Sequence, residues 1–180
     1  MSENIDHSAI VLATLQRVKV LLCDVDGVLT DGTVSIGQGG ECKSFSIQDG
    51  LGMRLLQKSG IPVGWISNRP STATRQRAQE LKIDFLYQES GGKVAAVDRI
   101  LMQAGLTWEE VCYIGDDVVD LAVLKRVGAP VVVANAIAEA KTLACHVTQH
   151  SGGHGAVREV AEMILKAQKK WSGLIMEYLA

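Results

Sequence analysis

The sequence predicts an α/β fold, a three-layer sandwich in which helices cover both faces of a mostly parallel β-sheet. Short apolar runs typical of buried parallel strands recur along the chain, and stretches with apolar residues at helical spacing separate them. One segment interrupts this alternation: residues 33–47 alternate apolar and polar side chains on both sides of a Gly-Gln-Gly-Gly turn, which predicts a β-hairpin. Strands that alternate with helices favour a single sheet with helices on both sides.

The N-terminal half is expected to begin with residues 8–17, which form either a short amphipathic helix or a frayed arm. The mostly apolar run 18–23 stops at Asp24, and its composition is typical of a buried parallel strand. Periodicity then predicts further elements beyond the hairpin. They are a helix over 50–59, a strand over 61–66, a polar helix over 71–82 and a strand over 83–87.

The C-terminal half continues the same alternation, and a capping-box pattern from Thr107 to Glu110 predicts a helix start. The other elements expected here are helices over 93–103, 118–126, 136–144 and 156–170, and strands over 111–114, 130–133 and 145–148. The tail 171–180 is apolar, so we expect either an interface element or a frayed end. With 180 residues, the chain is expected to form one domain over 1–180, with the C-terminal helix and tail at about 156–180.

Composition excludes several classes of function. Eighteen Lys and Arg residues against 20 Asp and Glu give a net charge of −2, so we expect no nucleic-acid partner. No apolar run is long enough to span a membrane, and the N-terminus lacks the pattern of a signal peptide, which together predict a soluble, cytoplasmic protein without a membrane partner. The four cysteines form no C-x-x-C pair, and Cys23 and Cys112 are expected to be buried, reduced thiols.

Carboxylates and other polar residues follow the predicted strands at the points where the strands end. Ligands of open α/β sheets bind beyond the carboxyl ends of the strands, so these residues are expected to converge on one small volume. They are Asp24 and Asp26 after the first strand, Ser67, Asn68 and Arg69 after the second, Lys93 at the start of the helix after the third, and Asp116, Asp117 and Asp120 after the fourth.

Several carboxylates held this close repel one another unless a cation compensates them. Hard oxygen ligands suit Mg²⁺, and no nearby set of His and Cys residues favours zinc. Lys93 would supply a second, fixed positive charge. A metal beside a carboxylate, a lysine and a small hydroxyl indicates phosphoryl transfer, in which one carboxylate is the nucleophile and a second acts as acid and base.

These four motifs, in this order, resemble the motif set of haloacid-dehalogenase-superfamily phosphatases over residues 18 to about 148. The resemblance implies a Rossmann-like sheet of the type found in that superfamily. It also implies that Asp24 is the nucleophile and Asp26 the general acid and base. Ser67 and Lys93 would hold the phosphoryl oxygens, and Lys93 would also orient the nucleophile.

The same resemblance implies a set of metal ligands. Asp24, the backbone carbonyl of Asp26 and Asp116 would bind Mg²⁺ directly, and Asp117 would bind it through water. Asp120 would position Lys93 or the loop.

No insertion is long enough for a large cap, so the hairpin stands in place of one. The segments 24–32, 43–45, 49–52 and 152–159 resemble those of the 3-deoxy-D-manno-octulosonate 8-phosphate phosphatase family. That resemblance implies a sugar-acid phosphate substrate in lipopolysaccharide or surface-sugar biosynthesis. It further implies a capless homotetramer in which a neighbouring subunit helps to close each active site.

Two alternatives to the eight-carbon phosphatase stay open from the sequence. Phosphatases of nine-carbon, sialic-acid-type 9-phosphates share nearly all these motifs, and this chain has Ser67-Asn68-Arg69 where the eight-carbon family usually has Ser/Thr-Gly-Arg. A non-catalytic phosphate-binding regulatory module is a further alternative, but Asp26, two residues after Asp24, stands where a water-activating base belongs.

The residues expected to bind phosphate or the sugar acid, besides Ser67, are Asn68, Arg69, Thr33, Lys43, Arg75 and Arg158.

Overall fold

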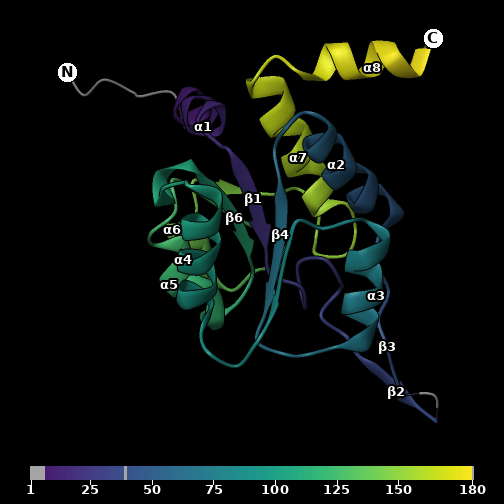
Figure 1. Ribbon diagram of the computed structural model, residues 1–180. Helices are drawn as coiled ribbons and strands as arrows, with labels where there is room; N and C mark the ends of the chain where they lie inside the picture. Colours follow the sequence, from purple (N-terminus) through teal and green to yellow (C-terminus); the bar gives the residue numbers. More distant parts are fainter. Residues whose placement is uncertain (1–6, 39, 180) are drawn as a thin grey trace.

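A six-stranded parallel sheet forms the centre of the protein (Figure 1), for which a computed structural model describes residues 7–38 and 40–179. The strand order is β5-β4-β1-β6-β7-β8, and every neighbouring pair is parallel. The strands are β1 (Val20–Cys23), β4 (Val63–Ser67), β5 (Phe85–Gln88), β6 (Val111–Gly115), β7 (Ala129–Val132) and β8 (His146–Val147). The predicted parallel sheet is therefore confirmed.

Helices cover both faces of this sheet, as predicted (Figure 1). One layer contains α4 (Lys93–Ala104), α5 (Leu121–Leu124) and α6 (Ala138–Leu143). The other contains α2 (Ile47–Lys58), α3 (Thr72–Glu80) and α7 (Ala156–Ala167), and α2 packs along α7. Helix α1 (His7–Gln16) also packs against α7.

The core lies between these layers. Strands β1, β4 and β6 are buried along their whole length, because helices cover them on both sides. Cys23 and Cys112 are buried there and unpaired, as expected. None of the helices in the described ranges is long and apolar enough to cross a membrane.

The hairpin is shorter than predicted. Its strands are β2 (Ser35–Gly37) and β3 (Gly40–Cys42), and Gly39 in the turn lies outside the described residues. The expected continuation of the second strand to residue 47 is wrong, because Ser46 instead begins a helix: its Oγ accepts a hydrogen bond from the Asp49 backbone N–H at 3.2 Å. The hairpin points away from the sheet (Figure 1).

Three predicted helical segments also differ from the structure. The capping box at Thr107 starts only the 3₁₀ turn η1 (Trp108–Glu110), and residues 118–126 divide into the 3₁₀ turn η2 (Val118–Asp120) and the short α5. Helix α7 ends at Ala167, and Lys169 has a left-handed φ of 58° that breaks the helix. The tail is not frayed over its described part: it forms α8 (Trp171–Leu179), which Leu174 anchors to the core.

Candidate active site

The carboxyl ends of β1, β4 and β6 surround a cleft of about 240 Å³. These three strands are neighbours in the sheet, so residues that are distant in the chain meet here. Its walls are Asp24, Asp26, Ser67, Asn68, Arg69, Lys93, Asp116, Asp117 and Val119. Eight of these nine residues are the strand-end residues that the sequence predicted to converge.

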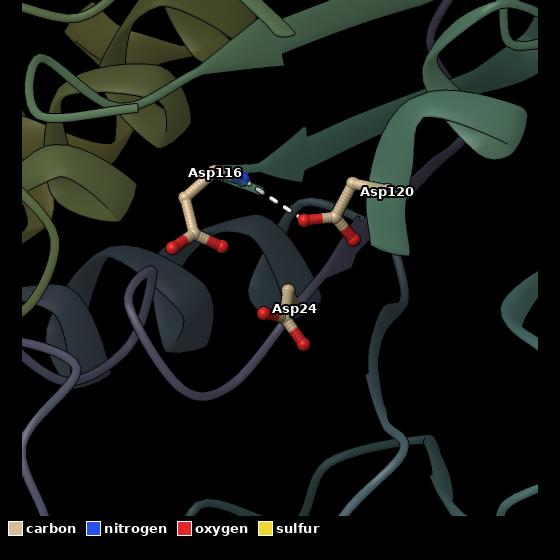
Figure 2. Close-up of side chains that lie close together, drawn as sticks. All are labelled: Asp24, Asp116 and Asp120. Atoms are coloured by element: carbon tan, nitrogen blue, oxygen red, sulfur yellow. Dashed lines mark hydrogen bonds between the residues drawn. The ribbon is translucent and has the colours of Figure 1, made fainter. Parts of the chain in front are cut away.

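Three carboxylates form the floor of the site (Figure 2). Asp24 directly follows β1, and its backbone N–H donates to the Ile114 carbonyl of β6 at 3.0 Å. Asp116 follows β6, and Asp120 lies one turn later in η2. One oxygen from each of Asp24, Asp116 and Asp120 lies within 4.8 Å of the other two (Figure 2).

Lys93 lies between two of these carboxylates. Its Nζ is 2.6 Å from Oδ1 of Asp24 and 2.7 Å from Oδ1 of Asp120, and its side chain is almost fully covered. Burial alone lowers the pKa of Lys93, but the two carboxylates outweigh burial, so the pKa is raised and the group is an ammonium ion. The position of Lys93 is set because it is the first residue of α4.

Both carboxylate oxygens of Asp120 accept hydrogen bonds from other groups of the protein. Oδ1 accepts from Lys93 and from the Tyr113 hydroxyl at 2.6 Å, and Oδ2 accepts from the backbone N–H of Asp116 at 2.9 Å and of Asp117 at 3.3 Å. A carboxylate with this many donors has little capacity left for a metal ion. Its contacts therefore fit the positioning of Lys93 and of the 116–117 loop.

The remaining carboxylate oxygens of the site suit a hard divalent cation as ligands. Asp116 Oδ1 is buried and has no hydrogen-bond partner among the described residues. Burial and the charges of Asp24 and Asp120 raise the pKa of Asp116 to about 8. Burial raises the pKa of Asp24 to about 6 even though Lys93 opposes the shift. Bound Mg²⁺ would relieve this repulsion and would give Asp116 Oδ1 a partner.

The loop after β1 must contain glycine for this arrangement to form. Gly27 has a φ of +97°, and a Cβ atom on it would lie 2.0 Å from Oδ2 of Asp116. Only glycine adopts this φ without strain and also leaves room for the carboxylate.

Asp26 lies at the edge of the cleft and pairs with the hairpin. Its Oδ1 is 2.6 Å from Nζ of Lys43, whose side chain is fully covered. Lys43, which the sequence suggested as a substrate-binding residue, therefore contacts Asp26 and does not line the cleft.

The loop after β4 supplies the polar side of the cleft. Ser67 Oγ accepts from the Arg69 backbone N–H at 3.0 Å, which holds the loop close to the strand end. Asn68 and Arg69 line the same wall.

Besides Lys43, three predicted substrate-binding residues lie outside the cleft walls of this chain. Thr33 donates to Asp31 at 2.6 Å, and Arg75 is exposed on α3. Arg158, near the start of α7, pairs with Glu162 at 2.8 Å. Long charged side chains reach many partners, so sequence position alone does not tell which partner they take.

Three residues at or beside the site were not predicted from the sequence: Glu41, Tyr113 and Val119. Glu41 lies in β3 and contacts Arg69, Lys43 and Ser71. For Tyr113, the signal in the sequence was a single hydroxyl inside an otherwise apolar strand, since a buried Tyr usually finds a hydrogen-bond partner.

Comparison with known proteins agrees with this geometry. A model of haloacid dehalogenase-like hydrolases matches residues 65–160. The 3-deoxy-D-manno-octulosonate 8-phosphate phosphatase of Yersinia pestis is 42% identical over 91% of this chain and 88% of its own length.

Solved structures give the same result. A crystal structure of the corresponding phosphatase from Moraxella catarrhalis, in complex with magnesium, phosphate and KDO, has a TM-score of 0.90 and 35% identity over 93% of this chain and 97% of that one. The cobalt-bound form of the Haemophilus influenzae phosphatase has a TM-score of 0.84 and 40% identity, over 87% of this chain and 92% of that one. The chain therefore belongs to the haloacid dehalogenase-like hydrolases, in the family of the 3-deoxy-D-manno-octulosonate 8-phosphate phosphatases.

Proposed function

We propose that this protein is a Mg²⁺-dependent phosphatase that hydrolyses 3-deoxy-D-manno-octulosonate 8-phosphate to the free sugar acid and phosphate, in lipopolysaccharide biosynthesis. The observation that carries the proposal is the cleft itself, where Lys93 bridges Asp24 and Asp120 beside Asp26, Ser67 and the unpartnered oxygen of Asp116. The names of the relatives favour the eight-carbon substrate over a nine-carbon, sialic-acid-type 9-phosphate.

The reaction has two steps on this chain's own residues. In the first, a carboxylate oxygen of Asp24 attacks phosphorus, the bond to the sugar oxygen breaks, and Asp26 donates a proton to that oxygen. In the second, Asp26 accepts a proton from water, the water oxygen attacks phosphorus, and the aspartyl-phosphate bond breaks to restore the Asp24 carboxylate. Lys93 keeps Asp24 in place, since its Nζ is 2.6 Å from Oδ1 of Asp24.

The metal site uses the acids described above. Asp24, Asp116 and the backbone carbonyl of Asp26 would hold Mg²⁺, and Asp117 would act through a water molecule. When bound, Mg²⁺ neutralises negative charge on the phosphoryl oxygens and on the acids around it.

The other groups of the cleft serve binding. Ser67 is buried at the end of β4, and its hydroxyl, which donates to the Arg69 carbonyl at 3.1 Å, can turn to donate to a phosphoryl oxygen instead. Arg69 offers guanidinium donors for an anionic group of the sugar acid, and Asn68 lies next to it.

We infer that the enzyme works as a homotetramer in which neighbouring subunits close each cleft. The hairpin supports this proposal, because it projects from the body and exposes 81% of Ile36 (Figure 1). Arg75 and Arg158, which lie outside the cleft walls of their own chain, could then serve a neighbouring subunit. A cytoplasmic location is supported by the cysteines of the described chain, which are unpaired as in a reducing compartment.

The decisive assay measures phosphate release from 3-deoxy-D-manno-octulosonate 8-phosphate and from nonulosonate 9-phosphates, with Mg²⁺ and with EDTA. The proposal expects metal-dependent release with the higher kcat/KM for the eight-carbon substrate. A preference for the nine-carbon substrates would overturn the assignment of substrate, and no metal-dependent release from any sugar phosphate would overturn the assignment of activity. Sedimentation that gives the mass of a single chain would contradict the tetramer.

A further inference from the structure

We propose that Glu41 of hairpin strand β3 is a positioning residue, which fixes the Arg69 guanidinium at the cleft and so determines how strongly the enzyme prefers sugar-acid phosphates to simple phosphate esters. The inference rests on the proposed function, because it assigns Arg69 to an anionic group of the sugar acid. It assigns to the hairpin a role within its own chain, in addition to any role in assembly.

Glu41 joins three segments of the chain. Its Oε2 is 2.6 Å from Nη2 of Arg69, which belongs to the loop after β4. Its Oε1 accepts a hydrogen bond from the hydroxyl of Ser71, the N-cap of α3, at 2.6 Å, and Nζ of Lys43 is 3.7 Å from the same oxygen. The Glu41 side chain is only 21% exposed, so its contacts are made in a largely covered position.

These contacts keep Glu41 ionised. The hydrogen bond from Ser71 lowers the pKa of Glu41, and the charges of Lys43 and Arg69 lower it further, although burial opposes the shift. A carboxylate at the edge of a cleft that takes an anion would repel the substrate if it were unpaired. Here two cations compensate it, so it can hold Arg69 without that repulsion.

Arg69 is fixed at both ends by these contacts. Its backbone N–H donates to Ser67 Oγ at 3.0 Å, and its side chain ends on Glu41. Because a guanidinium has five N–H donors in a planar fork, one contact with Glu41 leaves other donors free. The Arg69 side chain is 46% exposed and lines the cleft, so these donors can reach an anion bound there.

Holding the guanidinium in place removes a cost from binding. A free arginine side chain loses rotamer freedom when it pairs with a ligand, and this loss corresponds to a factor of about 2 to 12 in affinity. A substrate that pairs with Arg69 benefits from the preorganisation. An ester without a second anionic group does not benefit from it.

The test compares two substrates in each variant. The kcat/KM is measured with saturating Mg²⁺ for 3-deoxy-D-manno-octulosonate 8-phosphate and for p-nitrophenyl phosphate, and their ratio is taken as the selectivity. Both substrates report on the same preparation, so the ratio does not depend on the fraction of a variant that is folded. Hydrolysis of the sugar-acid phosphate by the wild-type enzyme tests the proposed function before any variant is made.

We expect Glu41→Gln to lower the selectivity about three- to tenfold, mainly through a higher KM for the sugar-acid phosphate. Glu41→Asp keeps the charge on a shorter side chain, and its selectivity should lie between those of Glu41→Gln and the wild type. The matched control is Glu177→Gln. Glu177 lies on α8, at the end of the molecule away from the hairpin (Figure 1), and its carboxylate pairs with Lys58 of α2. This variant should stay within about twofold of the wild type.

A double-mutant cycle with Arg69→Ala decides whether Glu41 acts through Arg69. In the Arg69→Ala background, Glu41→Gln should cause no further loss of selectivity. A wild-type selectivity in Glu41→Gln would overturn the inference. A further, additive loss in the double variant would also overturn it, since it would show that Glu41 acts independently of Arg69. Both results leave the proposed activity intact, whereas failure of the wild type to hydrolyse the sugar-acid phosphate refutes the proposed function itself.

Discussion

Replacing Gly27 with alanine should weaken metal binding more than it weakens the fold. Gly27 lies in the loop after β1 with a φ of +97°, and an alanine Cβ there would lie 2.0 Å from Oδ2 and 2.7 Å from Cγ of Asp116. Real Cβ contacts essentially never fall below 3.0 Å, so the Asp116 carboxylate must move by about 1 Å or more. The tolerance of a metal–ligand distance is only about 0.2 Å.

Two magnitudes follow from this geometry. The left-handed backbone conformation costs an alanine about 1–2 kcal/mol, which should appear as a lower free energy of unfolding. Disturbing even the residues behind a metal ligand typically costs 10- to 100-fold in metal affinity. Because Asp116 itself is displaced, we expect Mg²⁺ to bind at least about 100-fold more weakly to Gly27→Ala.

Calorimetric titration with Mg²⁺ measures this affinity, and Gly60→Ala is the control. Gly60 has a similar φ of +79°, but a Cβ atom there would have no neighbour within 4 Å. Gly60→Ala should therefore lose similar stability and keep the Mg²⁺ affinity of the wild type. If Gly27→Ala binds Mg²⁺ within about threefold of the wild type, Asp116 is not the ligand that the cleft geometry suggests.

Four other predictions concern single groups. Asp24→Asn should lower kcat by about 10³-fold or more while circular dichroism stays unchanged, and turnover near the wild-type rate would exclude Asp24 as the nucleophile. Mg²⁺ at 100 times its Kd should raise the free energy of unfolding by about 2.7 kcal/mol, and EDTA should reverse this; an unchanged melting curve would argue against a metal site. Tyr113→Phe removes a buried hydrogen bond to Asp120 and should cost about 1–3 kcal/mol in urea unfolding, so an unchanged midpoint would contradict that bond. Glu159 has a lowered pKa because, although burial opposes the shift, the His150 ring and the backbone N–H groups of 149–150 bond to it. Glu159 therefore stabilises the folded state above its unfolded pKa of about 4.5. This stabilisation is lost as the pH falls through the lower pKa that Glu159 has in the folded protein. Glu159→Gln should flatten the pH dependence of unfolding below about pH 4.5, and an unchanged slope would show that Glu159 contributes nothing to it.

The parallel sheet and the floor of the cleft could be predicted from the sequence because both depend on simple rules. A buried parallel strand must be apolar until it ends, so the first polar residue marks its carboxyl end. Asp24, Ser67 and Asp116 each stand at such a point, and the structure brings them to one cleft. The order of these residues in the chain was enough, because parallel strands present the same end to the same side.

The course of the chain after the hairpin could not be predicted in the same way. Residues 43–47 alternate in polarity like a strand, yet Ser46 caps a helix. A side-chain cap competes with strand pairing, and tertiary contacts decide between them. Lys43, for example, pairs with Asp26 at 2.6 Å, in the loop after β1.

Charged side chains on the outer surface were the least predictable part of the site. Arg69 follows a predicted strand and lines the cleft, whereas Arg75 and Arg158 fall within predicted helices and lie outside its walls. Glu41 attracted no notice in the sequence, because its importance depends on Arg69 and Ser71, which are distant along the chain. Such partnerships are set by topology and leave no local pattern.

The strand order also has a kinetic consequence. Strand β1 is paired between β4 and β6, which come much later in the chain, so the cleft depends on contacts between distant segments. Contacts of this kind make folding slow, because long loops must close before the pairing stabilises them. Asp24 and Asp116 can meet only after β6 has docked, and a partly folded chain that lacks this pairing has no preformed metal site. Bound Mg²⁺ should then leave the folding rate constant nearly unchanged and lower the unfolding rate constant. The metal would therefore increase the kinetic stability of the completed sheet.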